Sequence, residues 1–328
     1  MVIKNPSTFW ITFFSIILNT TPVCLALQSI NICAKPLQQR TMSPRSNLSV
    51  SSLNSLVESG ACSLGFVGCG TIASAIATGL AKQSSVPIKQ ISVSKRSEKK
   101  SSALVAQFPS INVFEDNQSV VDNADIIFVT VLPQQVNEVL QGLKFDTSRH
   151  VLVSLVSTSN LEDLAKYSGL SSDCIFKMIC LPSVAESEGV CLLTPPTDNS
   201  FIISLLESLG GVVQAENEKQ MSAMMVTSGL MGSFYGIMKN NRDFLVKQGI
   251  DGSKASFLVG RMYHSMIRDA EGRCRDPQAY EELIAEQTPG GLNEQGLDNL
   301  TKLGALDAFD KVQDAMLDRI EGKTDGSL

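Results

Sequence analysis

SLGFVGCGTIASAIATGLA, residues 63–81, joins a short apolar run, a glycine turn and a helical pattern. The run SLGFV predicts a buried strand, and Gly68-Cys69-Gly70 follows it directly. After Thr71, apolar residues recur every three or four positions, which predicts an amphipathic helix: Ile72, Ala75, Ile76, Gly79 and Leu80. The stretch therefore predicts a strand, a turn and a helix in immediate succession.

The turn has the pattern G-x-G-x-x-A, made by Gly68, Cys69, Gly70, Thr71, Ile72 and Ala73. In a dinucleotide-binding unit the first glycine permits the turn, and the second lets the backbone approach a pyrophosphate. A small third residue allows the helix to pack on the strand, and the helix N-terminus then faces the phosphates. We expect these six residues to bind the cofactor, the alternative being a purely structural turn.

A second predicted strand, residues 90–94, lacks a terminal acid that would bond a free ribose 2′-hydroxyl. The chain continues instead as Ser94-Lys95-Arg96-Ser97. Hydroxyls and cations suit a 2′-phosphate, because a guanidinium can bond it through two N–H groups. The tract predicts a preference for NADP(H), with NAD(H) and a solvated basic loop as the alternatives.

Further strands are predicted at 111–114, 124–131, 151–156 and 174–179, and helical segments separate them. This alternation predicts an α/β fold with a Rossmann-type, doubly wound parallel sheet over residues 61–195. The apolar run 124–131 stops at a proline, where loops of such a sheet face the cofactor. We therefore expect cofactor contacts from Val131, Leu132 and Pro133.

After residue 195 the sequence turns to helical periodicity, at 201–209, 219–239, 253–271, 278–285 and 303–320. This predicts an all-helical domain over residues 196–328. Within it Thr288-Pro289-Gly290-Gly291 opens another helix, and such a glycine turn presents backbone N–H groups to an anion.

Residues 1–60 have the composition of a targeting leader. Residues 1–57 contain no acid and carry four basic residues, so their removal takes the net charge from −6 to −10. An apolar core at 9–18 precedes a basic tail rich in Ser and Thr, a signal-like part followed by a transit-like part. This order favours a plastid, with the mitochondrion and the secretory pathway as alternatives.

The overall composition narrows the class of protein. The chain has 328 residues, of which 43% are apolar and 18% charged, which is typical of a globular protein of about two domains. A net charge of −6 gives no reason to expect nucleic acid as a partner. The apolar runs are too short for a membrane span, and the cysteines beyond the leader lack metal-ligand spacing, so no membrane or metal is expected in the mature protein.

Five pieces, in this order, resemble the pyrroline-5-carboxylate reductase family over residues 62–322: FVGCGTIASAIATGL, the tract 94–97, ADIIFVTVLPQQVNEVL, KMICLPSVAESEG and EQTPGGLNEQGL. The resemblance implies a Rossmann domain, a helical dimerisation domain, and reduction of a cyclic imino acid to proline with NAD(P)H. It also implies a homodimer or higher homo-oligomer. Where the family reads S-P-G-G-T-T, this chain has Leu292 and Asn293 in place of two hydroxyls, and R-x-M-P-N-T-P is replaced by residues 177–183, KMICLPS.

A cyclic imine is already largely cationic, so its reduction mainly requires that the enzyme position it and anchor its carboxylate. The candidate anchor is the turn of Thr288, Pro289, Gly290 and Gly291, with Asn293 as a further donor. Thr288 and Asn293 are accordingly the candidate catalytic residues. The sequence predicts NADPH-dependent reduction of a small cyclic imino acid, with pyrroline-5-carboxylate as the first choice.

Two other functions stay open. A β-hydroxyacid-type dehydrogenase relies on a lysine in G-x-x-G-x-x-x-K-x-x-x-N, and Gly232 and Lys239 have the matching separation. However, Tyr235 and Asp243 replace the second glycine and the asparagine. The second alternative is a cofactor-binding relative that has lost catalysis, which the changes in the substrate turn would support.

Overall fold

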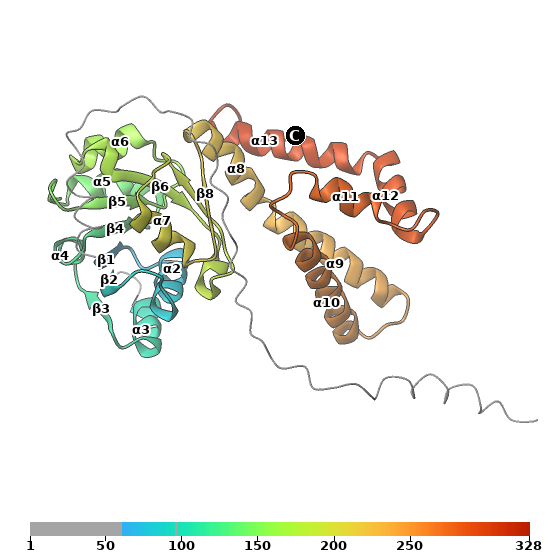
Figure 1. Ribbon diagram of the computed structural model, residues 1–328, viewed down its shortest axis with the longest axis horizontal. Coiled ribbons are helices and arrows are strands. Elements are labelled where there is room, and N and C mark those ends of the chain that lie inside the picture. Colours follow the sequence, from blue (N-terminus) through green and yellow to red (C-terminus); the bar gives the residue numbers. More distant parts are fainter. Residues whose placement is uncertain (1–60, 96–97) are drawn as a thin grey trace, which may run out of the picture. The chain divides into compact units, whose positions relative to one another are not determined.

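A computed structural model describes residues 61–95 and 98–328, so the predicted leader lies outside the described residues (Figure 1). The first part of this range alternates strands and helices as the sequence predicts. The elements are β1 (Cys62–Val67), α2 (Thr71–Lys82), β2 (Ile88–Ser94), α3 (Glu98–Gln107), β3 (Ile111–Phe114), α4 (Asn117–Asp122), β4 (Ile126–Val129), η1 (Pro133–Gln135), α5 (Val136–Gln141), β5 (Val151–Ser154), α6 (Leu161–Ser168), η2 (Ser172–Cys174) and β6 (Ile175–Ile179).

The strands form one sheet in the order β3-β2-β1-β4-β5-β6-β7-β8. Strands β1 to β6 pair in parallel, with Phe66 of β1 opposite Val93 of β2 and Phe128 of β4. The chain builds outward from β1 to β3, then returns to β4 on the other side of β1. This reversal is the topology of a doubly wound sheet, and it confirms the predicted fold class.

Strands β7 (Cys191–Thr194) and β8 (Val212–Gln214) extend the sheet beyond the six predicted strands. β7 is antiparallel to β6, and β8 is parallel to β7. Between them lies α7 (Ser200–Glu207). The sheet thus continues past residue 195, where the sequence places the end of the nucleotide-binding domain, and the expectation of helices alone after that residue is wrong at β8. The domain division itself stays a prediction.

Helices cover both faces of the sheet, because side chains of each strand alternate between the faces. Leu64 and Phe66 of β1 join a core with α2, α3 and α7, whereas Val67 joins a core with α4, α5 and α6. Phe66 and Phe128 stack with ring centroids 4.8 Å apart. Each fully buried side chain of this size contributes roughly 1.5–3 kcal/mol to the free energy of unfolding. The two layers therefore hold the strand ends in fixed positions.

Helix α2 also packs on the connection between β6 and β7, which contains the 3-10 segment η3 (Pro182–Glu186). A side chain at Gly79 would collide with the backbone carbonyl of Val184, so only glycine permits this approach. At the end of α2, Lys82 Nζ lies 2.7 Å from the carboxylate of Glu186. α2 is therefore fixed on a segment more than a hundred residues away in sequence.

The rest of the chain is helical: α8 (Glu218–Gly229), α9 (Met231–Lys247), α10 (Gly252–Glu271), α11 (Ala279–Ala285), α12 (Leu292–Lys302) and α13 (Ala305–Ile320). The helix predicted at 219–239 is interrupted at Leu230, which ends α8 and begins α9. Gly229 precedes this break, and a side chain there would collide with Met316 of α13. Within the described residues, no helix combines the length and apolar character that crossing a bilayer needs.

Candidate functional site: a glycine turn at the sheet's switch point

The glycine turn is held by the ends of two neighbouring strands. Gly68 has φ +101°, where a residue with a β-carbon is strained, and such a carbon would lie 2.9 Å from the Thr130 carbonyl. The Gly68 N–H donates to Ser94 Oγ over 2.9 Å. Thr130 Oγ1 donates to the carbonyls of Val67 and Gly68, at 3.1 and 3.0 Å. These bonds fix the turn against β2 and β4.

The start of α2 is open to an anion. Its N-cap residue is Gly70, and no side chain caps the helix. A β-carbon at Gly70 would meet no atom within 4 Å, so the space beside the turn is free on that side. Ala73, one turn further on, is fully buried against the sheet. The uncapped N–H groups and their helix dipole therefore suit a phosphate, as the sequence predicts.

A cavity of about 180 Å³ lies where the turn meets the end of β4. It brings together residues that the sequence proposes for the cofactor with two that it does not, and its lining is Gly68, Cys69, Gly70, Thr130, Val131, Leu132 and Gln135. Pro133 begins η1 and does not line the cavity. Open α/β sheets bind ligands at the carboxyl ends of strands where the chain order reverses, and β1 and β4 flank that point.

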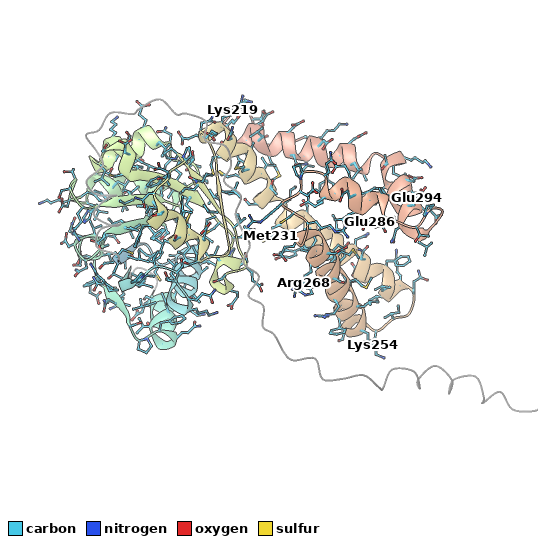
Figure 2. The ribbon with its side chains drawn as sticks, viewed as in Figure 1. Lys219, Met231, Lys254, Arg268, Glu286 and Glu294 are labelled. Carbon is cyan, nitrogen blue, oxygen red and sulfur yellow. The ribbon has the colours of Figure 1, made fainter. Side chains whose placement is uncertain are left out.

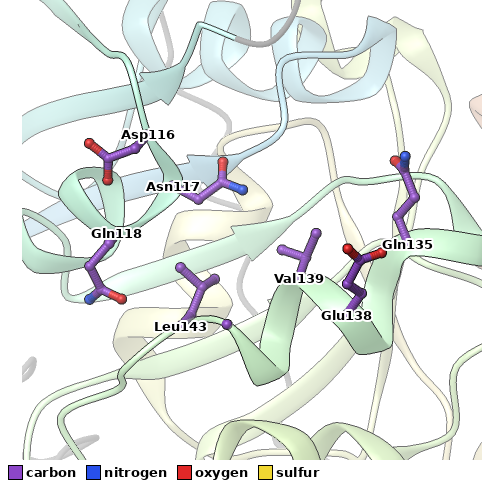
Figure 3. A pocket seen from close by; sticks show the side chains of 8 residues that line it. Asp116, Asn117, Gln118, Gln135, Glu138, Val139 and Leu143 are labelled. Carbon is purple, nitrogen blue, oxygen red and sulfur yellow. The ribbon is translucent and has the colours of Figure 1, made fainter.

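A second cavity, of about 420 Å³, adjoins the first through Gln135. Figure 3 shows its lining from two sides: Asp116, Asn117 and Gln118 near α4, and Gln135, Glu138, Val139 and Leu143 near α5. Gly142 completes the lining. Asp116 accepts the Ser119 N–H over 2.8 Å, and this bond holds the pKa of its carboxyl below the usual value. Together the cavities extend from the glycine turn past the ends of β3 and β4.

Two of the four residues predicted to bind a 2′-phosphate have partners inside the chain. The buried Ser94 hydroxyl accepts the Gly68 N–H. Lys95 Nζ lies 2.8 Å from a Glu115 oxygen, and this partner raises the pKa of Lys95. Arg96 and Ser97 lie outside the described residues. Ser94 thus supports the turn, and the described part of the tract holds one paired cation.

Sequence reasoning missed Thr130, Gln135 and Lys100. Lys100 Nζ donates to the Thr71 hydroxyl over 2.7 Å, beside the turn. Burial raises the pKa of the Cys69 thiol, while the Ser74 hydroxyl and the Lys100 charge oppose that rise. Thr130 could have been noticed, because it is the polar residue in an otherwise apolar strand end. Lys100 follows another lysine in an exposed helix, so no pattern distinguishes it.

The turn proposed for the substrate lies between α11 and α12, and the N–H groups of its two glycines already donate hydrogen bonds within the chain. Gly290 has φ +71°, and its N–H donates to the carboxylate of Glu294. The Gly291 N–H donates to the Thr288 carbonyl over 2.9 Å. Figure 2 labels Glu286, which ends α11, and Glu294, which lies in the first turn of α12. A substrate carboxylate at Gly290 would therefore have to displace Glu294.

The remaining candidates in this turn differ in their contacts. Asn293 Nδ2 donates to Gln287 Oε1 over 2.7 Å, whereas the Thr288 hydroxyl has no hydrogen bond among the described residues. Leu292 is 84% exposed. No hydrogen bond within the described residues joins this turn to the glycine turn at 68–70. The roles assigned to Thr288–Gly291 and Asn293 stay predictions.

Two lysines that bear on the alternatives are held in ion pairs. Lys239, the counterpart of a dehydrogenase lysine, is exposed and lies 2.7 Å from Asp243. Lys177, at the start of the KMICLPS segment, is only 6% exposed, and its Nζ lies 2.8 Å from Glu218 in the first turn of α8. Lys239 is thus part of a surface ion pair, and Lys177 connects the sheet to the helical region.

Sequence comparison is consistent with this geometry. A family model described as "NADP oxidoreductase coenzyme F420-dependent" matches residues 63–158. The pyrroline-5-carboxylate reductase of Methanosarcina acetivorans is 25% identical over 257 residues, which cover 75% of this chain and 92% of that protein. The same-named protein of Arabidopsis thaliana is 27% identical over 176 residues, 52% of this chain, and the match spans only 61% of its length.

Structure comparison points to the same fold. The crystal structure of Plasmodium falciparum pyrroline carboxylate reductase with NADP bound has a TM-score of 0.65 and 22% identity, covering 81% of this chain and 98% of that one. The doubly wound sheet and the phosphate-facing turn are typical of a Rossmann-type dinucleotide-binding domain. The comparisons agree with the resemblance seen in the sequence: the chain is similar to pyrroline-5-carboxylate reductases, and its fold is that of a solved member.

Proposed function

We propose that this chain is an NADPH-dependent imine reductase that converts pyrroline-5-carboxylate to proline. The observation that carries the proposal is the uncapped start of α2 at Gly70, beside a cavity at the switch point of the sheet. The proposal is further supported by similarity to a pyrroline-5-carboxylate reductase over 92% of that protein's length. The paired state of Lys239 gives the dehydrogenase alternative no support.

The residues present fit a dinucleotide. The N–H groups at Thr71 and Ile72 would receive the pyrophosphate, because Gly70 leaves that approach open. The adjoining cavities at Val131, Leu132 and Gln135 would receive one end of the cofactor, beside the pyrophosphate. Bound NADPH supplies the hydride. The chain would position the cofactor and the substrate. His150 and His264, its histidines among the described residues, line neither cavity.

The substrate anchor is the turn at 288–293. The Thr288 hydroxyl, which has no hydrogen bond among the described residues, can donate to a carboxylate at once. The Gly290 N–H becomes available when Glu294 turns away. Leu292 presents an apolar group where the family has a hydroxyl. This composition supports a small cyclic imino acid with apolar ring atoms as the substrate class.

Oxidation of NADPH in the presence of cyclic imino acids tests the function. Purified protein should oxidise NADPH with pyrroline-5-carboxylate, and the six-membered homologue serves as a second substrate. The matched variant is Gly70→Ala, whose new methyl group meets no protein atom but fills the approach of the pyrophosphate. It should keep the melting temperature and lose at least about tenfold in turnover at low NADPH. If neither imine is reduced, the proposal fails.

We also propose that the helical region pairs with a second copy of the chain. No residue of α9, α12 or α13 is buried, and α10 buries only Ala255 and Val259. The exposed apolar residues instead include Phe244, Phe257, Met262, Met266 and Leu306. Helices of this composition need a cover, and a two-fold axis covers such a face with itself.

A further inference from the structure

Lys100 places a positive charge at the corner between the glycine turn and the end of β2. Its ammonium donates to the hydroxyl of Thr71, the first residue of α2, over 2.7 Å. It is also close enough to Cys69 to stabilise the thiolate form of that residue. Lys100 lies in the first turn of α3, six residues after the end of β2. It therefore lies on the side of the turn where a dinucleotide's adenosine ribose is held in this fold.

The surroundings leave this cation available. A cavity of about 260 Å³ lies between α2 and α3. It is lined by Thr71, Ser74 and Thr78 of α2 and by Lys100, Ala103, Leu104 and Gln107 of α3. This lining contains no carboxylate, and within the described residues Lys100 forms no ion pair. Lys95, the described cation in the loop after β2, is paired with Glu115. Lys100 is thus the cation that lines this cavity, and no carboxylate among the described residues pairs with it.

We propose that Lys100 determines the preference for a phosphorylated cofactor by binding its 2′-phosphate. When the cofactor binds, the Lys100 ammonium donates to a phosphate oxygen in place of the Thr71 hydroxyl. Its hydrogen-bond acceptor is then charged and no longer neutral. The pyrophosphate has its own partners in the uncapped N–H groups of α2, so the lysine serves the additional phosphate. A cofactor without that phosphate offers Lys100 only a hydroxyl, which Thr71 already supplies. The inference rests on the proposed use of a dinucleotide, and it names the residue that selects between the two kinds.

Calorimetric binding to the full-length chain tests this role without any imine. The ligands are NADPH, NADH, 2′,5′-ADP and ADP, and the variants are Lys100→Gln and Lys100→Arg. Lys100→Gln should weaken NADPH and 2′,5′-ADP by about 10- to 100-fold, the effect of one charge-assisted hydrogen bond. Binding of NADH and ADP should change less than about threefold, because neither carries a 2′-phosphate. Lys100→Arg should retain most of the preference.

Lys99 provides the matched control, because it is an exposed lysine in the same helical turn. Lys99→Gln removes the same charge and should leave all four affinities unchanged. Equal weakening of all four ligands by Lys100→Gln would assign the residue to the 5′-phosphate that they share. Unchanged affinities would assign it to the Thr71 contact alone, and either result overturns the proposal. A chain that binds NADPH through Lys100 but reduces no imine would leave this inference standing and remove the proposed function.

Discussion

His150 makes folding stability depend on pH through a single buried ring. The side chain is 2% exposed, its Nδ1 accepts the Asp146 N–H over 3.0 Å, and its buried Nε2 has no partner in the described structure. Burial lowers the pKa of His150 below its usual 6.5. The folded state therefore holds the neutral ring at pH values where the unfolded chain already binds a proton.

The stability that depends on neutral His150 is present above about pH 6.5 and is lost as the pH falls from there toward the lowered folded-state value. His150→Gln keeps an acceptor for Asp146 and cannot titrate. Denaturant unfolding between pH 7.5 and 5 should show a smaller loss of stability in this variant than in the native chain. His264→Gln, at an exposed histidine, should keep the native slope. Parallel curves for the native chain and His150→Gln would contradict the prediction.

Individual residues were predictable where the backbone requires a particular type. Gly68 and Gly70 could be assigned from spacing alone, because a turn with positive φ and a close approach both require glycine. The partners of Ser94 and Lys95 could not be assigned from the sequence. The Ser94 bond depends on which strand lies beside the turn, and the Lys95 ion pair depends on an acid twenty residues away. The same holds for Gly290, whose N–H is taken by Glu294.

At the scale of elements, the contact between α2 and η3 gives a clear test of packing. A methyl group at Gly79 would collide with the Val184 carbonyl and lie 2.8 Å from Leu209 Cδ2, so one of the two segments must move. Gly79→Ala should therefore destabilise the protein by about 1–3 kcal/mol, as overpacking does elsewhere. Thermal unfolding measures this loss. Gly296→Ala, in α12 where a methyl group meets nothing, should instead leave stability unchanged or raise it slightly.

The elements themselves were mostly predictable, and the exceptions have physical reasons. The strands from β1 to β6 have apolar runs at βαβ spacing. β8 has only three residues, and an apolar run that short does not distinguish a strand from other buried segments. β7 has four residues, but it follows β6 without an α-helix between them and pairs antiparallel to it, so it falls outside the βαβ spacing. The break at Leu230 has no proline to mark it; it depends on the approach of α8 to Met316.

For the whole molecule, the exposed face of α10 predicts the state of association. Met262 is 50% exposed in the middle of this helix, among apolar neighbours. Met262→Glu should convert a dimer into monomers, because a paired interface would bury the new charge without a partner. Sedimentation velocity measures the change. Lys254→Glu, at the polar start of the same helix, should leave the dimer intact, and a native chain that sediments as a monomer would contradict the proposed pairing.

The fixing of α2 on η3 affects how a ligand is received. Gly79 lets the helix contact the backbone at Val184, and Lys82 pairs with Glu186 at its last turn. In the turn before the helix, the Gly68 N–H donates to Ser94 and the Gly68 carbonyl accepts from Thr130. The amides at the start of the helix are therefore oriented in advance, and a dinucleotide need not organise them. Binding then loses little conformational entropy, so most of the contact energy at this end of the cofactor remains as affinity.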